Sequence, residues 1–292
     1  LKEDISKDIT KKKSKSPFAS LKESLSKDLE KEKPKKFDMA FLKATIKDTL
    51  REKDQDEGEI KIPENRVATG IEGFDETIEG GFVKDSVTLL CGGPGSGKSI
   101  FAMQYLINGI DKCGENGVYI SFEEEPETLI EDMKRFDFDI EKKIKEKKIA
   151  LLYFSPEQVD RVIAIGGGPV REVIESINAK RAVIDSVTAF TLLYKTSNEQ
   201  RKALMSLFKT LKKWDCTTLL VSEQTLNPEE HVSTVEEYQS EGVIFMYNIK
   251  KGDVRERSIE VFKMRGTNHS TKINPLKITF EGIIVYPEHN VY

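Results

Sequence analysis

Apolar and polar positions along the chain predict strands and helices in turn. Five short runs are dominated by apolar residues, as expected for strands that are buried on both faces of a sheet. They lie at 85–91, 117–122, 150–155, 181–187 and 217–224. Stretches with helical spacing alternate with them, at 99–110, 126–136, 160–180 and 198–214. Buried strands that alternate with amphipathic helices predict an α/β core whose mostly parallel sheet is sandwiched by helices.

The pattern changes after Gln224, where strand-like runs follow one another without intervening helices. These runs lie at 242–249, 257–266 and 276–287, and the segment KKGD at 250–253 is typical of a turn between the first two. The sequence therefore predicts a C-terminal extension made of antiparallel hairpins.

The second of these strands ends on two cations, in the segment SIEVFKMRGTNHS at 258–270. A period of two places Ile259, Val261, Lys263 and Arg265 on one face of the strand. Two like charges on one face are costly unless an anion lies opposite them. We therefore expect an anionic group near Lys263 and Arg265.

Residues 1–57 contain neither a strand-like run nor enough apolar residues for a core. They hold three variants of one phrase in which Leu or Ile recurs every four residues, LKEDISKDI (1–9), LKESLSKDL (21–29) and LKATIKDTL (42–50). The segment is either a solvated, partly helical tail or a set of amphipathic motifs that dock on a partner protein or a neighbouring subunit. We expect this N-terminal extension to precede one domain at 58–292.

Composition narrows the class of protein. The 292 residues carry a formal net charge of −4, and residues 1–57 hold 16 Lys or Arg against 13 Asp or Glu, whereas the remainder holds 30 against 37. An acidic main domain argues against general nucleic-acid affinity. No apolar run approaches the roughly 20 residues that cross a bilayer, and no secretory signal is evident. Three widely spaced cysteines favour neither disulfides nor zinc, so we expect a cytoplasmic protein.

The segment GGPGSGKS at 92–99 matches the phosphate-binding P-loop, G-x-x-x-x-G-K-[ST]. It lies between a predicted strand and a predicted helix, where backbone N–H groups and the helix N-terminus can surround the phosphates of ATP. We expect Lys98 to reach the β- and γ-phosphates and the Ser99 hydroxyl to bind Mg²⁺. The predicted ATP-binding residues of this motif are Gly93, Pro94, Gly95, Ser96, Gly97, Lys98, Ser99 and Ile100.

Carboxylates follow two further strands. The run AVIDS at 182–186 brings Asp185 to a strand end, where it is predicted to hold Mg²⁺ together with Ser99; the alternative is a cap for the next helix. In SFEEEPE at 121–127, one of Glu123 and Glu124 is the candidate that orients and deprotonates water, unless the segment is only a solvated acidic turn.

The segment VSEQ at 221–224 ends another strand at the same edge of the predicted sheet. Ser222 and Gln224 are candidates for sensing the γ-phosphate, and a polar loop start is the alternative. The following loop, 225–242, contains five glutamates and no lysine or arginine, so it would repel DNA phosphates. The three histidines show no metal-ligand spacing, and we expect His231 to lie on the surface.

Six separated motifs together resemble the KaiC-like ATPases of the RecA superfamily, over about residues 62–292. In chain order they are TGIEGFDETIEGGF (69–82), the P-loop, GVYISFEEEPE, AVIDSVT, VSEQ and VFKMRGTNHS. The closing ITFEGIIVYP is similar to the single-domain archaeal members of that group. The resemblance does not extend to residues 1–57.

The resemblance implies a RecA-type core and subunits that assemble as rings, usually homohexamers, with ATP at the subunit interfaces. It also implies that Glu123 and Glu124 are the catalytic pair, and that Lys263 and Arg265 are fingers that reach the γ-phosphate bound by the neighbouring subunit. Two further residues fall on positions near the nucleotide across the same interface, Thr267 and His269. The anion expected opposite the two cations would then be a triphosphate on the next molecule.

The clock protein of this family departs from the chain in two respects. It has two such domains, whereas this chain has one P-loop. Its adjacent phosphorylation sites correspond, counted without gaps, to positions near Glu237 and Tyr238 and not to Ser233 and Thr234. We therefore expect neither autophosphorylation nor a clock function.

The function expected from the sequence is that of a ring-forming, Mg²⁺-dependent ATPase that acts as a nucleotide-dependent regulatory switch. Its partners would be further copies of the chain and a protein bound through residues 1–57, without nucleic acid or membrane. One alternative is a DNA-repair ATPase of the RecA/RadA type, which the acidic loop disfavours. The other is an ATP-binding assembly protein with little turnover, which the paired glutamates and Asp185 disfavour.

Overall fold

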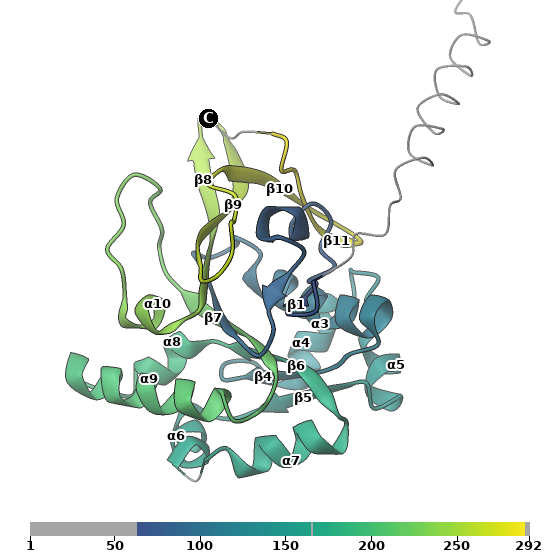
Figure 1. Ribbon diagram of the computed structural model, residues 1–292, viewed down its shortest axis with the longest axis vertical. Helices are drawn as coiled ribbons and strands as arrows, with labels where there is room; N and C mark the ends of the chain where they lie inside the picture. Colours follow the sequence, from purple (N-terminus) through teal and green to yellow (C-terminus); the bar gives the residue numbers. More distant parts are fainter. Residues whose placement is uncertain (1–62, 165, 290–292) are drawn as a thin grey trace, which may run out of the picture. The chain divides into compact units, whose positions relative to one another are not determined.

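The computed structural model describes residues 63–164 and 166–289 (Figure 1). Within these residues, nine strands form one sheet in the order β11-β10-β9-β8-β3-β7-β6-β4-β5. All pairs from β8 to β5 are parallel, and the pairs from β8 to β11 are antiparallel. The predicted α/β fold with an antiparallel C-terminal extension is thereby confirmed, whereas the predicted extension at 1–57 lies outside the described residues.

The strands of the large sheet follow the apolar runs of the sequence. They are β3 (Val87–Gly92), β4 (Asn116–Ser121), β5 (Ile149–Tyr153), β6 (Ala179–Asp185), β7 (Thr217–Glu223), β8 (Gly242–Lys251), β9 (Val254–Met264), β10 (Ile273–Thr279) and β11 (Gly282–Val285). A separate pair, β1 (Arg66–Val67) and β2 (Phe82–Val83), flanks a short 3₁₀ helix, η1 (Asp75–Ile78).

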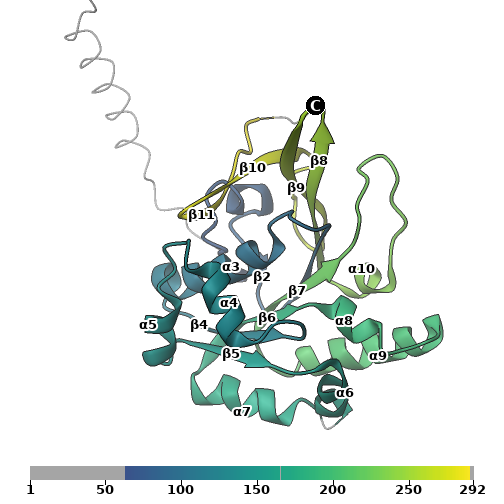
Figure 2. The same ribbon diagram turned by 180° about the vertical axis from the view of Figure 1, so that it is seen from behind.

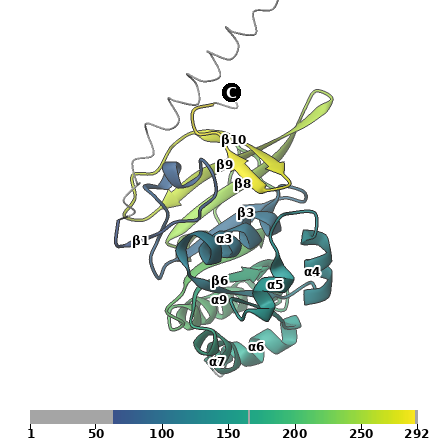
Figure 3. The ribbon, with the colours of Figure 1, turned by 90° about the vertical axis from the view of Figure 1, so that its right-hand side faces the viewer.

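Helices cover both faces of the sheet (Figures 2 and 3). One face packs against α3 (Lys98–Cys113), α4 (Pro126–Met133) and α5 (Ile140–Lys145), whose apolar residues share one hydrophobic cluster with β1 and β2. The other face packs against α6 (Pro156–Ala164), α7 (Gly168–Ser176), α8 (Val187–Thr191) and α9 (Ser197–Leu211), which form a second cluster. The buried parallel strands are therefore apolar on both sides, as their sequences predict.

Two predicted elements are divided in the structure. The helical stretch predicted at 160–180 is two helices, because Gly166 and Gly167 adopt φ angles of 78° and 77°, a left-handed conformation that ends a helix. The run predicted at 276–287 is a hairpin, β10 and β11, whose register brings Thr279 opposite Gly282. No helix among residues 63–164 and 166–289 is long and apolar enough to cross a membrane.

The predicted face of the two cations in β9 is wrong, because a β-bulge interrupts the alternation. Val243 of β8 pairs with Lys263, but the next residue, Ile244, pairs with Val261, so that Phe262 is an extra residue. Met264 consequently joins Val261 in the first hydrophobic cluster. Lys263 is turned to the other face, on which Phe262 packs against the ring of Phe245 in the second cluster.

Candidate functional site

The P-loop connects β3, in the centre of the sheet, to α3. Gly95 and Gly97 adopt φ angles of 71° and 104°, which glycine alone adopts at little cost. The Lys98 ammonium lies 3.3 Å from the Gly93 carbonyl oxygen and 4.0 Å from a carboxylate oxygen of Glu223. A cavity of about 520 Å³ opens beside the loop and is lined by its first residues, Gly93, Pro94 and Gly95. The loop, the lysine and the start of α3 thus form a cradle suited to an anionic group.

Two side chains of the β8–β9 hairpin also hold this loop. Asn248 Nδ2 donates to the Pro94 carbonyl at 3.2 Å, and Arg257 Nε donates to the Gly95 carbonyl at 2.8 Å. The sequence reasoning did not identify either residue. The signal lies in the register, because Gly92 pairs with Met246 and Asn248 is only two residues further along β8.

The predicted metal ligands are brought together at the carboxyl ends of the parallel strands. Ser99, in the first turn of α3, donates from Oγ to Asp185 Oδ2 at 2.9 Å, and the phenol of Tyr119 donates to the same oxygen at 2.6 Å. Burial raises the pKa of Asp185, and the hydrogen bonds from Tyr119 and Ser99 oppose this rise. Burial and the nearby Asp185 carboxylate raise the pKa of Tyr119, so that its phenol keeps the proton it donates.

The two candidate glutamates lie beside this carboxylate. Ser121, at the end of β4, pairs with Asp185, so that Glu123 and Glu124 follow at the same edge of the sheet. Glu123 Oε1 accepts a hydrogen bond from the hydroxyl of Ser186. The pKa of Glu124 is raised by burial and further by the carboxylates of Asp132, Asp185 and Glu123. Glu123 is thus held in position by Ser186, and the pKa of Glu124 is raised, and each property suits a residue that handles water.

Gln224 adjoins the P-loop through its backbone. Its N–H donates to the Gly92 carbonyl at 3.2 Å, and its side-chain amide lies 3.5 Å from the hydroxyl of Ser222 and 3.4 Å from that of Thr234. The backbone of Gln224 thus adjoins the P-loop, and its role in sensing the γ-phosphate stays a prediction.

Lys263 and Arg265 are not brought to this site. Lys263 Nζ donates to the Glu237 carbonyl at 2.6 Å, and Arg265 Nη2 donates to the Tyr238 carbonyl at 3.1 Å, both near the end of α10 (Val235–Gln239). Burial and the neighbouring Arg265 lower the pKa of Lys263.

The register fixes how far the two cations lie from the P-loop. Lys263 pairs with Val243, which pairs with Leu89 of β3, whereas the P-loop follows Gly92 at the other end of that strand. At 3.3 Å per residue, this separates the pairing position of Lys263 from Gly92 by about 10 Å along the strand. The hydrogen bonds to α10 direct both side chains away from their own P-loop.

The remaining predicted residues, Thr267 and His269, lie in the loop after β9, on the side of the two cations. Arg66 holds this loop, since its guanidinium donates to Thr267 Oγ1 at 2.6 Å, to the Gly266 carbonyl at 3.0 Å and to Glu79 at 2.9 Å. His269 Nδ1 lies 2.9 Å from the Ser270 carbonyl oxygen. No local pattern links Arg66 to a loop 200 residues away in the chain.

His231, which was expected on the surface, is partly exposed, with 19% of its side-chain surface accessible. Its ring clusters with those of Phe245 and Phe262, with centroids at 4.7 Å and 5.2 Å, and its Nε2 is 2.8 Å from a carboxylate oxygen of the buried Glu237. The loop after β7 thus packs His231 against β8 and β9, a tertiary contact that no local pattern indicates.

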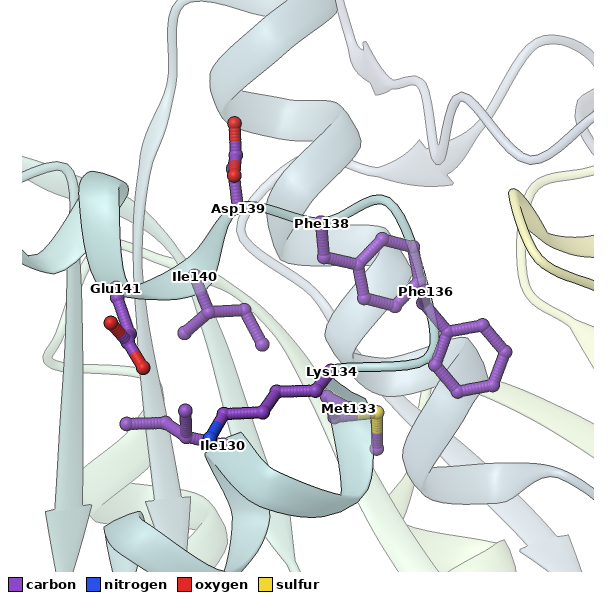
Figure 4. A pocket seen from close by; sticks show the side chains of 8 residues that line it. All are labelled: Ile130, Met133, Lys134, Phe136, Phe138, Asp139, Ile140 and Glu141. Carbon is purple, nitrogen blue, oxygen red and sulfur yellow. The ribbon is translucent and has the colours of Figure 1, made fainter.

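A second cavity, of about 180 Å³, lies at the end of α4 and the start of α5 (Figure 4). It is lined by Ile130, Met133, Lys134, Phe136, Phe138, Asp139, Ile140 and Glu141. None of the predicted site residues lines this cavity, so it is separate from the P-loop site.

The donors at the P-loop fit magnesium. Ser99 and Asp185 offer a hydroxyl and a carboxylate oxygen, the hard ligands that Mg²⁺ prefers. Among the residues that the structure describes, no group of three or more His, Cys, Asp or Glu could hold a metal ion by itself. Magnesium at P-loops commonly takes only one or two protein ligands and completes its shell with phosphate oxygens and water, so the donor set here is sufficient.

Comparison with known proteins agrees with this geometry. The model of the family described as "ATPase: KaiC" matches residues 67–290. The UPF0273 protein PF1931 of Pyrococcus furiosus is 36% identical over 236 residues, which cover 76% of this chain and 94% of that protein. The crystal structure of the KaiC-like protein PH0186 from Pyrococcus horikoshii OT3 superposes with a TM-score of 0.68 at 37% identity, covering 77% of this chain and 100% of that one.

The relatives that carry a clock name are longer. The circadian clock oscillator protein KaiC of Synechococcus elongatus is 35% identical over 233 residues, which cover 76% of this chain but only 44% of that protein. The chain thus spans less than half the length of these clock proteins. The matches in sequence and in fold establish that the chain belongs to the KaiC family of ATPases, within the RecA superfamily.

Proposed function

We propose that this protein hydrolyses ATP to ADP and phosphate in a Mg²⁺-dependent reaction at its P-loop, as a subunit of a ring. The observation that carries the proposal is the convergence of four groups at one edge of the sheet. These are the start of α3, Ser99, Asp185 and the Glu123–Glu124 pair, which come from three different strands or their following loops. If these carboxylates only stabilised the fold, nothing would require them to lie beside a P-loop.

The residues have distinct roles in this proposal. The N–H groups of the P-loop and the Lys98 ammonium hold the phosphates, while Ser99 and Asp185 would hold Mg²⁺, which would supply positive charge against the phosphates. One of Glu123 and Glu124 accepts a proton from a water molecule while the oxygen of that water forms a bond to the γ-phosphorus. The bond from that phosphorus to the bridging oxygen breaks, and ADP leaves with the bond's electron pair.

The ring follows from the place of the two cations. Lys263 and Arg265 are hydrogen-bonded to α10, toward the opposite end of β3 from their own P-loop. Cations that cannot serve their own site can serve the γ-phosphate of an adjacent subunit, and such fingers are typically worth ~10³–10⁵ in rate. Thr267 and His269, on the same loop, would face the same neighbouring nucleotide. We propose a homohexamer, in line with the resemblance to KaiC-like ATPases.

The proposed biological role is a nucleotide-dependent switch, in which ATP and ADP favour different states of the ring. Relatives named for the circadian clock are more than twice as long as the matched part of this chain, and one P-loop is present here. The clock role is therefore not part of the proposal. We propose that residues 1–57 connect the state of the ring to a protein partner.

Single substitutions of the acidic triplet test the catalytic assignment. We expect Glu123→Gln or Glu124→Gln, whichever removes the base, to lower the hydrolysis rate by about 10²–10⁴-fold while ATP still binds. Glu125→Gln is the matched control, because Glu125 is the N-cap residue of α4. This variant is expected to hydrolyse ATP at the wild-type rate. Wild-type rates in both Glu123→Gln and Glu124→Gln would contradict the assignment.

The same assay separates the two other functions that the sequence allows. A DNA-repair ATPase would be stimulated by DNA and would bind it with a steep salt dependence. An assembly protein would form rings with ATP but turn it over no faster than Glu123→Gln and Glu124→Gln do. We expect neither DNA stimulation nor an absence of turnover.

A further inference from the structure

Tyr119 is a buried residue that the proposed reaction does not use. It lies on β4, between β5 and β6, and only 1% of its surface is exposed. Its neighbours on the strand, Val118 and Ile120, are apolar core residues, and its ring belongs to the first hydrophobic cluster. Its hydroxyl, however, reaches Asp185 Oδ2 at 2.6 Å, at the edge of the sheet where the metal ligands meet.

Two donors converge on one oxygen of this carboxylate. Ser99 Oγ also donates to Oδ2, at 2.9 Å, and among the described residues every hydrogen bond to the side chain of Asp185 reaches that oxygen. A carboxylate held at Oδ2 on two sides cannot rotate freely, and its other oxygen, Oδ1, is left for a metal ion or for a water bound to one. The two donors differ in stiffness, because a phenol packed within a sheet is rigid, whereas the Ser99 hydroxyl rotates and is itself a predicted ligand.

We propose that Tyr119 is a positioning residue for magnesium, which holds the carboxylate of Asp185 in one orientation whether or not the Ser99 hydroxyl is engaged with the ion. This inference rests on the proposed function. Mg²⁺ tolerates little departure from octahedral geometry, so the orientation of a ligand carboxylate matters more for this ion than for a larger one. Loss of a residue that orients a metal ligand typically costs 10–100-fold in metal affinity.

Tyr105 provides a matched control. It is a second fully buried tyrosine in the same hydrophobic cluster, and its hydroxyl donates to the Thr217 carbonyl at 3.0 Å, in the core and not at the metal ligands. Tyr105→Phe and Tyr119→Phe each remove one buried hydroxyl and keep every apolar contact. Both variants are expected to fold, and thermal unfolding compares them with the wild type.

The test measures metal binding directly as well as hydrolysis. Mn²⁺ binding to the full chain in the presence of ADP, followed by electron paramagnetic resonance, is expected to weaken about 10–100-fold in Tyr119→Phe and to stay unchanged in Tyr105→Phe. The Mg²⁺ concentration for half-maximal ATP hydrolysis is expected to rise by the same factor, with kcat largely recovered at saturating Mg²⁺. Binding of ADP without metal is expected to be unchanged.

Three outcomes would overturn the inference. These are a wild-type metal affinity in Tyr119→Phe, equal losses in the two variants, and a loss of metal-free ADP binding as large as the loss of Mn²⁺ binding. The last two would indicate a structural role. A wild-type protein that binds Mn²⁺ with ADP but hydrolyses no ATP would refute the proposed function alone, and the Mn²⁺ titration would still decide the role of Tyr119.

Discussion

At the scale of one residue, burial of the Asp185 carboxylate at the candidate site lowers the stability of the folded protein. Its carboxylate is buried at the end of β6, and burial raises its pKa even though Tyr119 and Ser99 donate to it. A group whose pKa is higher in the folded than in the unfolded state contributes stability below its unfolded value, and that contribution is lost as the pH rises through the folded value. The ionised form of Asp185 therefore destabilises the ligand-free protein, and a bound cation would relieve this cost.

Replacement of this charge is predicted to stabilise the ligand-free protein. Asp185→Asn keeps an oxygen that accepts from Tyr119 and Ser99 but removes the buried charge. We expect its free energy of unfolding at pH 7 to exceed that of the wild type, because burial disfavours the charged form of the Asp185 side chain. The difference should shrink as the pH falls through the raised pKa of the wild-type carboxyl, because the protonated side chain carries no charge.

Urea unfolding at pH 7 and at pH 5 measures this difference. Lys180→Gln, at an exposed position of the same strand, serves as a control that changes a charge away from the site. A less stable Asp185→Asn at pH 7 would show that the hydrogen bonds outweigh the burial of the charge. Hydrolysis by Asp185→Asn should nevertheless be lost.

At the scale of elements, the bulge in β9 decides where the two cations point. If Phe262 paired with Val243 in a regular ladder, the alternation that buries Ile259 and Val261 would direct Lys263 into the same hydrophobic cluster. With the bulge, Met264 takes the core position, and Lys263 and Arg265 reach the carbonyls of α10. The bulge therefore lets a strand that contains Phe262 end on two cations outside the core.

Deletion of Phe262 is predicted to cost little more than its truncation. The deletion removes the bulge, and Lys263 then follows Val261 directly, so that Lys263 still pairs with Val243 and Met264 with Gly242. Phe262→Ala keeps the bulge and loses only contacts with Phe245 and His231 by a ring that is 42% exposed, which should cost about 1–2 kcal/mol. Denaturant unfolding compares the two variants, and a deletion variant several kcal/mol less stable than Phe262→Ala would contradict this account of the register.

The sequence predicted the elements whose signals are local. The P-loop lies between the predicted strand and helix because its glycines, Lys98 and Ser99 are consecutive, and Asp185 directly follows an apolar run. Tyr119 could not be found in this way, because within an apolar strand its sequence context is that of a core residue. The contacts of Asn248 and Arg257 with the P-loop depend on the register of β8 with β3. The bulge at Phe262 depends on the register of β8 with β9. Distant parts of the chain determine both registers together.

At the scale of the whole molecule, the strand order separates the P-loop site from the two cations of β9 within one subunit. The P-loop, Asp185 and the two glutamates lie at the carboxyl ends of the parallel strands. Lys263 and Arg265 lie toward the other end of β3, and Arg66 fixes the loop that follows them. A subunit built in this way presents a site on one side and cations on another, so that copies arranged in a ring would complete each other's sites.

Mixing two inactive variants tests this central claim most directly. Lys98→Ala disables the P-loop but keeps the cations, whereas the double variant Lys263→Ala/Arg265→Ala keeps the P-loop but lacks them. Each alone should hydrolyse ATP at most at about 10⁻³ of the wild-type rate. In an equal mixture that forms mixed rings, about a quarter of the interfaces join an intact P-loop to intact cations, so we predict recovery of about a quarter of wild-type hydrolysis. A mixture that contains mixed rings, verified with differently tagged subunits, and yet stays as inactive as its components would contradict the account.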